Sequence, residues 1–306
     1  MSASQVARRM WTLFEPVHTV TYFAAEARAA FEAAGLRGFW RGYFAGRSAP
    51  LGPVTAAPVT ASFYTFAPQM VSRALPAVWD LITPDQALEV REAGAVAALN
   101  RLLGGLTDAA TVAADMLCEA ASDLDCSGRV LGGANAALPM PADPLARLWH
   151  AATVLREHRG DGHFAALLAA DIDGCESVVL RAGIDLPRTT IQPLRGWTDE
   201  QWTAAASRLT ERGLVGSDGS ATQAGAAMRA EIEATTDGVA ARPWRDEEFA
   251  ADLAEVLYPI ALACSAEVPA PNPVGAPSPD GGASVMEGPP DEGDAVTEGP
   301  RDGGAS

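Results

Sequence analysis

The sequence predicts a mainly α-helical protein, and three observations lead to this fold class. Apolar residues recur at helical spacing along most of the 306-residue chain, and no segment shows the alternation typical of a half-buried strand. Glycine and proline divide the helical segments, and good N-cap residues precede several of them. Hydrophobic residues make up 48% of the chain, which is enough for a substantial core. We therefore expect packed helices with very little sheet.

Three regions follow one another along the chain. Residues 1–142 are predicted to form a helical domain, and residues 143–264 a second one. Residues 265–306 form an acidic tail rich in proline and glycine. We expect this tail to be disordered, because such a segment cannot bury enough apolar surface to offset its chain entropy.

The first region contains helical patterns separated by turn residues. An alanine-rich helix is expected over 17–34, ending at Gly35. Pro16 favours the start of this helix, since proline suits a first turn better than a helix interior. Further helices are expected near 84–103 and 107–122.

Two strong helix starts mark the second region. Asp143 is a good N-cap, and Pro144 suits the first helical position. Thr198 is also a good N-cap, and Gln201 three residues later completes a capping box. These residues predict helices that begin at 144 and at 199.

The stretch "LREHRGDGH" at 155–163 predicts a corner between two helices. Gly160 and Gly162 would break the helix that starts at Pro144. His158 would then lie in the last helical turn, where its protonated form complements the dipole. Asp161 or Gly162 would cap the next helix.

The pattern after Thr198 ends in a short hairpin and a final helix. The helix of 199–212 stops at Gly213. Residues 214–215 and 220–221 would pair as two very short strands around a turn at 217–219. A new helix would start near Thr222. A helix, a minimal β-hairpin and a helix in this order form the closing half of a winged helix.

The run "RLTERGLV…SATQAG" resembles the MarR-type pattern, in which a recognition helix ends in "RGLV" and a wing follows. The chain to about residue 263 resembles an actinobacterial helix-turn-helix family related to MarR regulators. The segments that carry this resemblance are "EPVHTVTYF" at 15–23, "GYFAGRSAPLGPV" at 42–54, "LREHRGDGH" at 155–163 and "GW" at 196–197. The resemblance implies a MarR-like winged helix in the second region, and a homodimer formed through the terminal helices.

The composition excludes several kinds of chemistry and disfavours others. All 22 basic residues are arginines, because the chain contains no lysine. Schiff-base, pyridoxal phosphate and Walker A chemistry all need a lysine. The net charge is −17, and most of it belongs to residues 1–264, since the tail carries eight acids against one arginine. Such an acidic surface repels phosphate backbones at long range.

The resemblance implies DNA binding through the helix that ends in "RGLV". The candidate DNA contacts on its outward face are Thr203, Ser207, Arg208 and Arg212. The same helix begins with Asp199 and Glu200, which suit the helix dipole but repel phosphates. The wing at 216–219 lacks an arginine for the minor groove. Duplex DNA is therefore a partner that the local charge disfavours.

Polar-tipped side chains in apolar, aromatic surroundings are the candidate ligand-binding residues of the first region. They are His18, Tyr22, Tyr43, Arg47 and Tyr64. Tyr43 and Arg47 are four residues apart, so that they meet on one helix face. Such groups suit a largely apolar pocket for an aromatic or acidic small molecule, in which Arg47 binds a carboxylate or phosphate.

Two more candidates, Arg159 and His163, would line a crevice between the two domains. The alternative is that all of these side chains are core residues. In that case Arg47 would pair with Glu15 or Glu26.

The histidines and cysteines predict no metal site. His158 and His163 are five residues apart with two glycines between them, whereas zinc-binding helices place histidines at i and i+4. The four cysteines lack finger spacing and are expected as free thiols. No GxSxG nucleophile elbow occurs. We expect no cofactor.

The uncharged stretch at 48–72 is interrupted by four prolines, which argues against a membrane span. The apolar run near the N-terminus is too short for a signal peptide. We therefore expect a cytoplasmic protein.

These features predict a ligand-responsive transcriptional regulator of MarR type with a weak or degraded DNA-binding surface. Its small-molecule pocket would lie between the two domains. The alternative is a small-molecule-binding enzyme or carrier on a repurposed winged-helix scaffold, although the sequence favours a binder over an enzyme. A third reading is a protein-interaction module that uses the acidic surface and tail.

Overall fold

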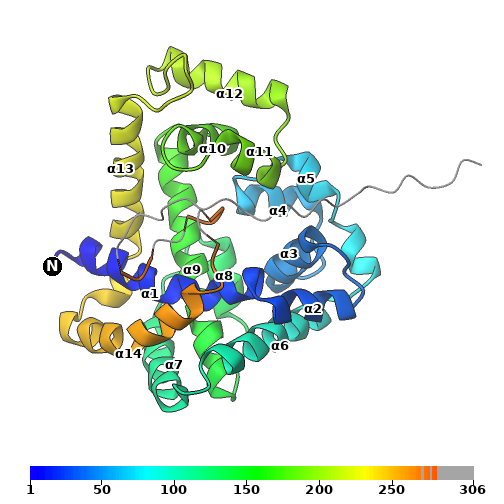
Figure 1. The fold of residues 1–306 in the computed structure, drawn as a ribbon, viewed down its shortest axis with the longest axis vertical. Helices are drawn as coiled ribbons and strands as arrows, with labels where there is room; N and C mark the ends of the chain where they lie inside the picture. The colour runs from blue at the N-terminus through cyan, green and yellow to red at the C-terminus, as the bar shows by residue number, and fades with distance from the viewer. Residues whose placement is uncertain (270–271, 276–277, 281–306) are drawn as a thin grey trace, which may run out of the picture.

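The computed structural model describes residues 1–269, 272–275 and 278–280 (Figure 1). These residues form fourteen α-helices, and a bridge between Val215 and Ala221 is their one sheet-type pairing. The mainly α-helical fold is thus confirmed. The helices of the first region are α1 (Ala3–Phe23), α2 (Ala25–Ala33), α3 (Phe39–Ser48), α4 (Ala56–Phe63), α5 (Pro68–Ser72), α6 (Pro84–Leu102), α7 (Thr107–Ser122) and α8 (Val130–Ala136). Those of the second region are α9 (Pro144–Ala169), α10 (Gly174–Ala182), α11 (Arg188–Arg195), α12 (Asp199–Glu211), α13 (Gln223–Val239) and α14 (Glu247–Ser265).

Helix α9 is the central axis of the molecule, with the other helices arranged around it (Figure 1). It contacts α1, α6, α7, α8 and α13. Side chains on all its sides are buried, so that α9 is a core helix rather than an amphipathic surface helix. It therefore connects the first region to the helices at the top of Figure 1.

The helices pack around three apolar cores. The largest lies mainly between α1, α7, α9 and α14 and contains Trp149 and Trp244. The second is an aromatic core around α3 and α4 that includes Phe44 and Phe63. The third belongs to α10, α11, α12 and α13 and includes Trp202. Because α14 packs against α1, the first and last helices of the fold lie side by side.

Helix α1 continues through Pro16, although the sequence predicted a helix start there. A proline inside a helix loses a hydrogen bond and costs about 3 kcal/mol. Leu13 and Val17 on either side of Pro16 are fully buried, and this packing against α9 and α14 offsets the cost. The expected helix over 17–34 is therefore two helices, which meet at Ala24.

Helix α9 also continues where Gly160 and Gly162 predicted a corner. A Cβ atom at Gly162 would lie 2.6 Å from Arg129 Nη1 and 2.9 Å from Val239 Cγ2. The glycine therefore allows α8 and the end of α13 to approach α9 closely. The chain turns later, after Ala170, where Asp171 adopts a positive φ of 53°.

The residues beside these glycines also differ from the prediction. Asp161 does not begin a new helix; its carboxylate instead accepts a hydrogen bond from Gly132 N in the first turn of α8, at 2.8 Å. His158 does not lie in a last helical turn. It is buried within α9, and burial lowers its pKa to about 4.

The helix starts predicted from capping residues are confirmed. The Asp143 side chain accepts hydrogen bonds from Leu145 N and Ala146 N, and α9 follows. The Thr198–Gln201 capping box opens α12. Helix α13 begins directly after Thr222. All three starts depend on side chains within four residues of the helix, which is why the sequence shows them.

The expected hairpin between α12 and α13 is reduced to the single bridge of Val215 and Ala221. The turn between them uses Gly219, whose φ is 82°.

No described helix is long and apolar enough to cross a membrane. Most of the tail that was predicted to be disordered lies outside the described residues.

Candidate functional site

A cavity of about 140 Å³ lies between the first region and helices α10–α13. Side chains of α1, α3, α9, α10, α11 and α13 form its walls, together with the segment 273–275 that follows α14. The cavity therefore lies where the crevice between the two halves was expected.

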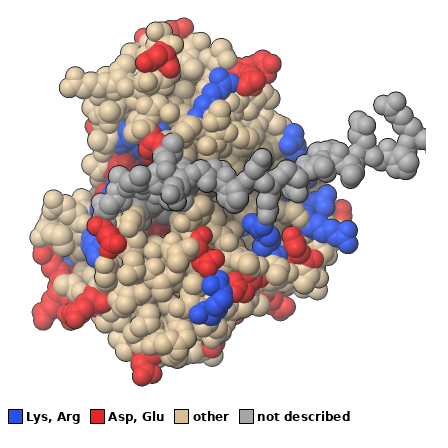
Figure 2. Space-filling model, viewed as in Figure 1, with Lys and Arg blue, Asp and Glu red and all other residues tan. Residues whose placement is uncertain are grey.

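Arginine is the dominant polar residue of this cavity. Six arginines line it, namely Arg47, Arg156, Arg159, Arg181, Arg195 and Arg229. Only two carboxylates line it, those of Glu15 and Glu233. By contrast, acidic side chains gather on the outer surface over α14, at the lower left of Figure 2. An acidic protein thus concentrates positive charge inside one cavity.

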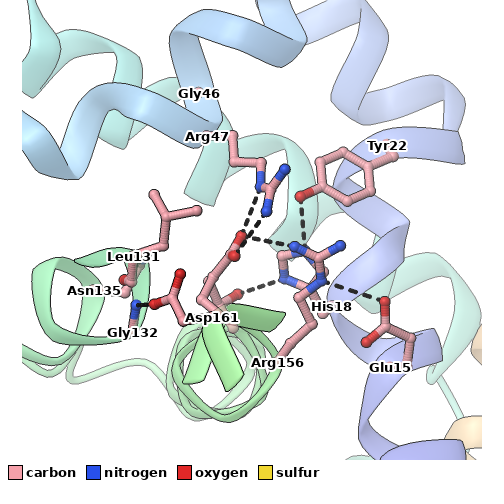
Figure 3. Close-up of polar contacts among 12 residues, drawn as sticks. Glu15, His18, Tyr22, Gly46, Arg47, Leu131, Gly132, Asn135, Arg156 and Asp161 are labelled. Carbon is pink, nitrogen blue, oxygen red and sulfur yellow. Dashed lines mark hydrogen bonds and ion pairs between the residues drawn. The ribbon is translucent and has the colours of Figure 1, made fainter. Parts of the chain in front are cut away.

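Two of these arginines are neutralised by a buried carboxylate of α9. Arg47 makes a bidentate pair with Glu157, with N–O distances of 2.9 and 3.0 Å. Arg156 donates to the same carboxylate at 2.9 Å and lies 3.4 Å from Glu15 (Figure 3). The two guanidinium groups hold the pKa of Glu157 well below its usual range despite its burial. This network joins α1, α3 and α9 and leaves no charge unpaired.

A second network joins α1, α9 and α13. Arg159 donates to Glu233 at 3.1 Å and to Asp237 at 3.0 Å, and Arg8 donates to both carboxylates at 2.7 Å. Arg229 lies 2.8 Å from Glu233. The Nε atom of Arg159 is buried and has no hydrogen-bond partner among the described residues.

The cavity arginines of α10 and α11 differ from those of the two networks, because main-chain carbonyls are their main hydrogen-bond partners. Arg181 donates to the carbonyls of Asn272 and Pro273 at 3.0 and 2.9 Å. Arg195 donates to Pro273 O at 2.6 Å and to Leu194 O at 3.2 Å. Burial lowers the pKa of Arg195 to about 10. No carboxylate of the described residues lies within 4 Å of this guanidinium, whereas Arg181 pairs with the half-exposed Asp185 at 3.1 Å.

Aromatic side chains complete the walls of the cavity. They are Trp11, Tyr43, Phe63, Phe66 and Phe164. The Arg195 guanidinium lies 4.7 Å from the centre of the Phe66 ring, and that of Arg47 lies 4.1 Å from Phe63. The cavity thus offers cationic donors and ring faces together, a combination suited to an anionic ligand with a flat apolar part.

Four of the seven residues predicted to bind a ligand line this cavity, namely Tyr43, Arg47, Arg159 and His163. The partner of Arg47 is Glu157, so the alternative pairing with Glu15 or Glu26 does not occur. Glu26 pairs with Arg101 instead. His163 shares a hydrogen bond with Thr236 at 3.0 Å, and burial lowers its pKa to about 4.

The other three predicted ligand residues lie elsewhere. His18 and Tyr22 line a separate cavity of about 20 Å³, too small for more than a water molecule. His18 shares hydrogen bonds with Thr153 and Tyr22, both at 2.9 Å (Figure 3). The hydroxyl of Tyr64 donates to Ile172 O at 2.6 Å, which ties the first region to the turn before α10.

The sequence reasoning missed the cavity arginines 156, 181, 195 and 229 and the carboxylate of Glu157. Arg156 could have been found, because it lies one turn from Arg159 on the helix that also carries Glu157. Arg181 and Arg195 give no such signal, since the carbonyls of Asn272 and Pro273 that they bind lie 78 or more residues away in the sequence.

Two of the candidate DNA contacts on α12 are engaged within the protein. Arg208 donates to Glu176 at 2.6 Å and to Asp173 at 2.5 Å. Arg212 donates to the carbonyls of Ala170 and Asp171. Both side chains therefore hold α12 against the turn between α9 and α10. Thr203 and Ser207 face an open hollow beside the bridged turn of 216–220.

Among the described residues, no group of three histidine, cysteine or acidic side chains could hold a metal ion. The ring of His158 contacts Asp125 O, whereas that of His163 contacts Thr236, so these two rings do not converge.

The succession of α10, α11 and α12, followed by a bridged turn and α13, defines a protein of the helix-turn-helix class with a large helical partner region. Residues 7–271 match a helix-turn-helix family, and the chain belongs to that family. A search of curated proteins and a search of solved structures each found no match.

Proposed function

We propose that this protein is a cytoplasmic, ligand-responsive transcriptional regulator of MarR-like type, in which the arginine-lined cavity is the effector site. One observation carries this proposal. Arg195 lines the cavity and is also the last residue of α11, directly before the turn that leads into α12. A ligand at Arg195 would therefore act on the helix-turn-helix itself.

The turn between α11 and α12 is bonded to the first region, which supports such coupling. Ala67 N donates to Arg195 O at 2.8 Å, and Trp197 Nε1 donates to Thr65 O at 2.9 Å. Gln69 donates to Gly196 O at 2.8 Å. Residues 65 and 66 of the same segment line the cavity. A change at the cavity wall would thus shift the position of α12 relative to the first region.

The DNA contact would be made by the outward face of α12. Thr203 and Ser207 are free to reach base edges beside the short bridged turn. The half-exposed Arg208 and Arg212 would exchange their intramolecular partners for phosphates. Because residues 151–244 carry nine arginines against thirteen acids, we expect weak affinity with strong salt dependence.

The test is a selection of duplexes from a random-sequence library with the full chain at low salt, followed by affinity measurements on the enriched duplex. We expect enrichment of a sequence motif. The double variant Arg208→Ala/Arg212→Ala should weaken binding and reduce the slope of log affinity against log salt by about two. The matched control Arg41→Ala/Arg245→Ala removes two exposed charges away from α12 and should leave the slope unchanged. Failure to enrich any motif would contradict the proposal that this protein is a transcriptional regulator.

The internal partners of Arg208 and Arg212 favour a second candidate, a small-molecule carrier that has kept the fold without reading DNA. The carrier would bind the same ligand in the same cavity. Ligand binding without duplex enrichment would distinguish the carrier from the regulator.

A further inference from the structure

We infer that Arg181 and Arg195 form an oxyanion-binding subsite, which the main-chain carbonyls of Asn272 and Pro273 occupy in this structure. A compact oxyanion, either a carboxylate on a single ring or a free phosphate, takes the place of these carbonyls and releases the segment 272–275. The inference deepens the effector site proposed above by naming the ligand chemistry of that cavity.

The donor geometry is the first support. Two guanidinium groups from different helices converge on one oxygen, Pro273 O, at 2.9 and 2.6 Å. Asn272 O takes a third donor, from Arg181. These three N–H donors point to neighbouring acceptor oxygens, and the oxygens of one anionic group can accept from all three. An ionised oxygen carries a full negative charge, so its hydrogen bonds to arginine gain a Coulomb attraction that a neutral carbonyl does not supply.

The charge balance is the second support. Arg195 is 9% exposed and has no carboxylate of the described residues within 4 Å. Burial is the main cause that lowers the pKa of Arg195; Arg181, Arg47 and Arg156 lower it further, whereas Tyr43 raises it. A carbonyl carries only a partial charge, so the buried guanidinium of Arg195 has no neutralising partner in the part of the chain that the structure describes. Burial of an unpaired charge is costly, and a bound anion removes this cost.

The surrounding walls fit a ring. Phe66 stacks beneath the Arg195 guanidinium, and Val178 and Ile191 add apolar surface to the cavity. The volume of about 140 Å³ approaches the roughly 150 Å³ of an apolar cavity that binds benzene. The ring of a single-ring ligand therefore has a size that this volume can hold.

The segment that supplies the carbonyls is suited to release. It follows the end of α14 at Ser265 and contributes no helix to the fold. Gly275 packs flat on Arg181, where an added Cβ would lie 3.4 Å from Arg181 Nη1. Pro273 has no N–H to donate. Arg181 and Arg195 hold this segment through its two carbonyl oxygens, and an anion accepts hydrogen bonds from the same N–H donors.

The experiment measures binding of benzoate, benzamide and inorganic phosphate to the full chain by calorimetry, with hydrogen exchange followed by mass spectrometry. Benzamide is the matched neutral control for benzoate. We expect benzoate or phosphate to bind at least about tenfold more tightly than benzamide, because the neutral amide lacks the negative charge that attracts both guanidinium groups. Bound anion should raise exchange in peptides that contain Val274 and Gly275, and lower it around Arg195.

The comparison of the two anions assigns the source of the oxyanion: tighter binding of benzoate points to a ring carboxylate, and tighter binding of phosphate to a free or ester phosphate. Arg195→Gln should reduce the affinity of the better anion by about tenfold or more. Arg188→Gln, on the same helix but outside the cavity, should leave it unchanged.

Equal affinities for benzoate, phosphate and benzamide would contradict the proposal of an oxyanion subsite. Anion binding that leaves hydrogen exchange at Val274 and Gly275 unchanged would contradict it as well. The exchange measurement on the unaltered chain keeps the test valid if Arg195→Gln fails to fold. None of these readouts uses DNA. A failed duplex selection would therefore contradict the proposed function as a regulator and leave the proposal of an oxyanion subsite unaffected.

Discussion

The two sides of the cavity hold their arginines in different ways. On the side formed by α1, α3 and α9, carboxylates neutralise Arg47 and Arg156. On the side formed by α10 and α11, Arg195 bonds to main-chain carbonyls and lies against a ring. The difference teaches that the partner of a buried arginine indicates the role of that arginine. A carboxylate partner indicates a structural ion pair, whereas a carbonyl partner leaves the positive charge of the guanidinium available to a ligand.

The strongest test of the neutralised side removes its shared carboxylate. Glu157→Gln would leave Arg47 and Arg156 buried with most of their negative charge gone. We expect the free energy of unfolding to fall by about 3–5 kcal/mol, measured by urea denaturation. Glu231→Gln on the exposed face of α13 is the matched control and should change stability little. A loss for Glu157→Gln as small as that of the control would remove the distinction between the two sides.

The pH dependence of stability tests the charge state of the cavity itself. His163 lines the cavity, and burial lowers its pKa to about 4, against about 6.5 in the unfolded chain. Between these two values the unfolded state binds the extra proton, so stability falls as the pH falls from 6.5 to 4. The fall attributable to this shift is about 3 kcal/mol.

The variant His163→Gln should flatten the stability profile between pH 6.5 and 4, and denaturation across that range would measure the change. Part of the slope should remain, because the pKa values of His150 and His158 are also lowered to about 4. Profiles that stay parallel for the two proteins would show that His163 is not held neutral by its surroundings.

What the sequence could predict depended on how local the cause was. Asp143, Thr198 and Thr222 cap helices through bonds to residues two or three positions away, and each predicted helix start was confirmed. Gly160 and Gly162 suggested a corner by the same local rule. That prediction was wrong because packing against Arg129 and Val239, which local rules do not contain, keeps α9 straight through them.

The site was predictable only in part, for a related reason. Tyr43 and Arg47 share a helix face, so their joint placement in the cavity followed from spacing. The cavity's position beside the helix-turn-helix depends on bonds such as that of Trp197 to Thr65, which join segments 132 residues apart. No periodicity in either segment shows that contact. The sequence also cannot show which carbonyl binds Arg195, because every residue has a carbonyl.

The smallest expected effect is the most direct test of the difference between the two sides. Arg195→Met removes a buried charge that no carboxylate of the described residues neutralises, so the free energy of unfolding should change by less than about 1 kcal/mol. Arg47→Met leaves Glu157 with Arg156 alone and should cost about 3 kcal/mol. Both variants exchange arginine for the same unbranched, uncharged side chain, and urea denaturation compares them in one assay. Equal losses would mean that the Pro273 carbonyl stabilises Arg195 as well as a carboxylate stabilises Arg47, and the α10–α11 side would then be structural. A stable Arg195→Met protein would instead show that the fold does not need this guanidinium, which is the property expected of a residue kept for a ligand.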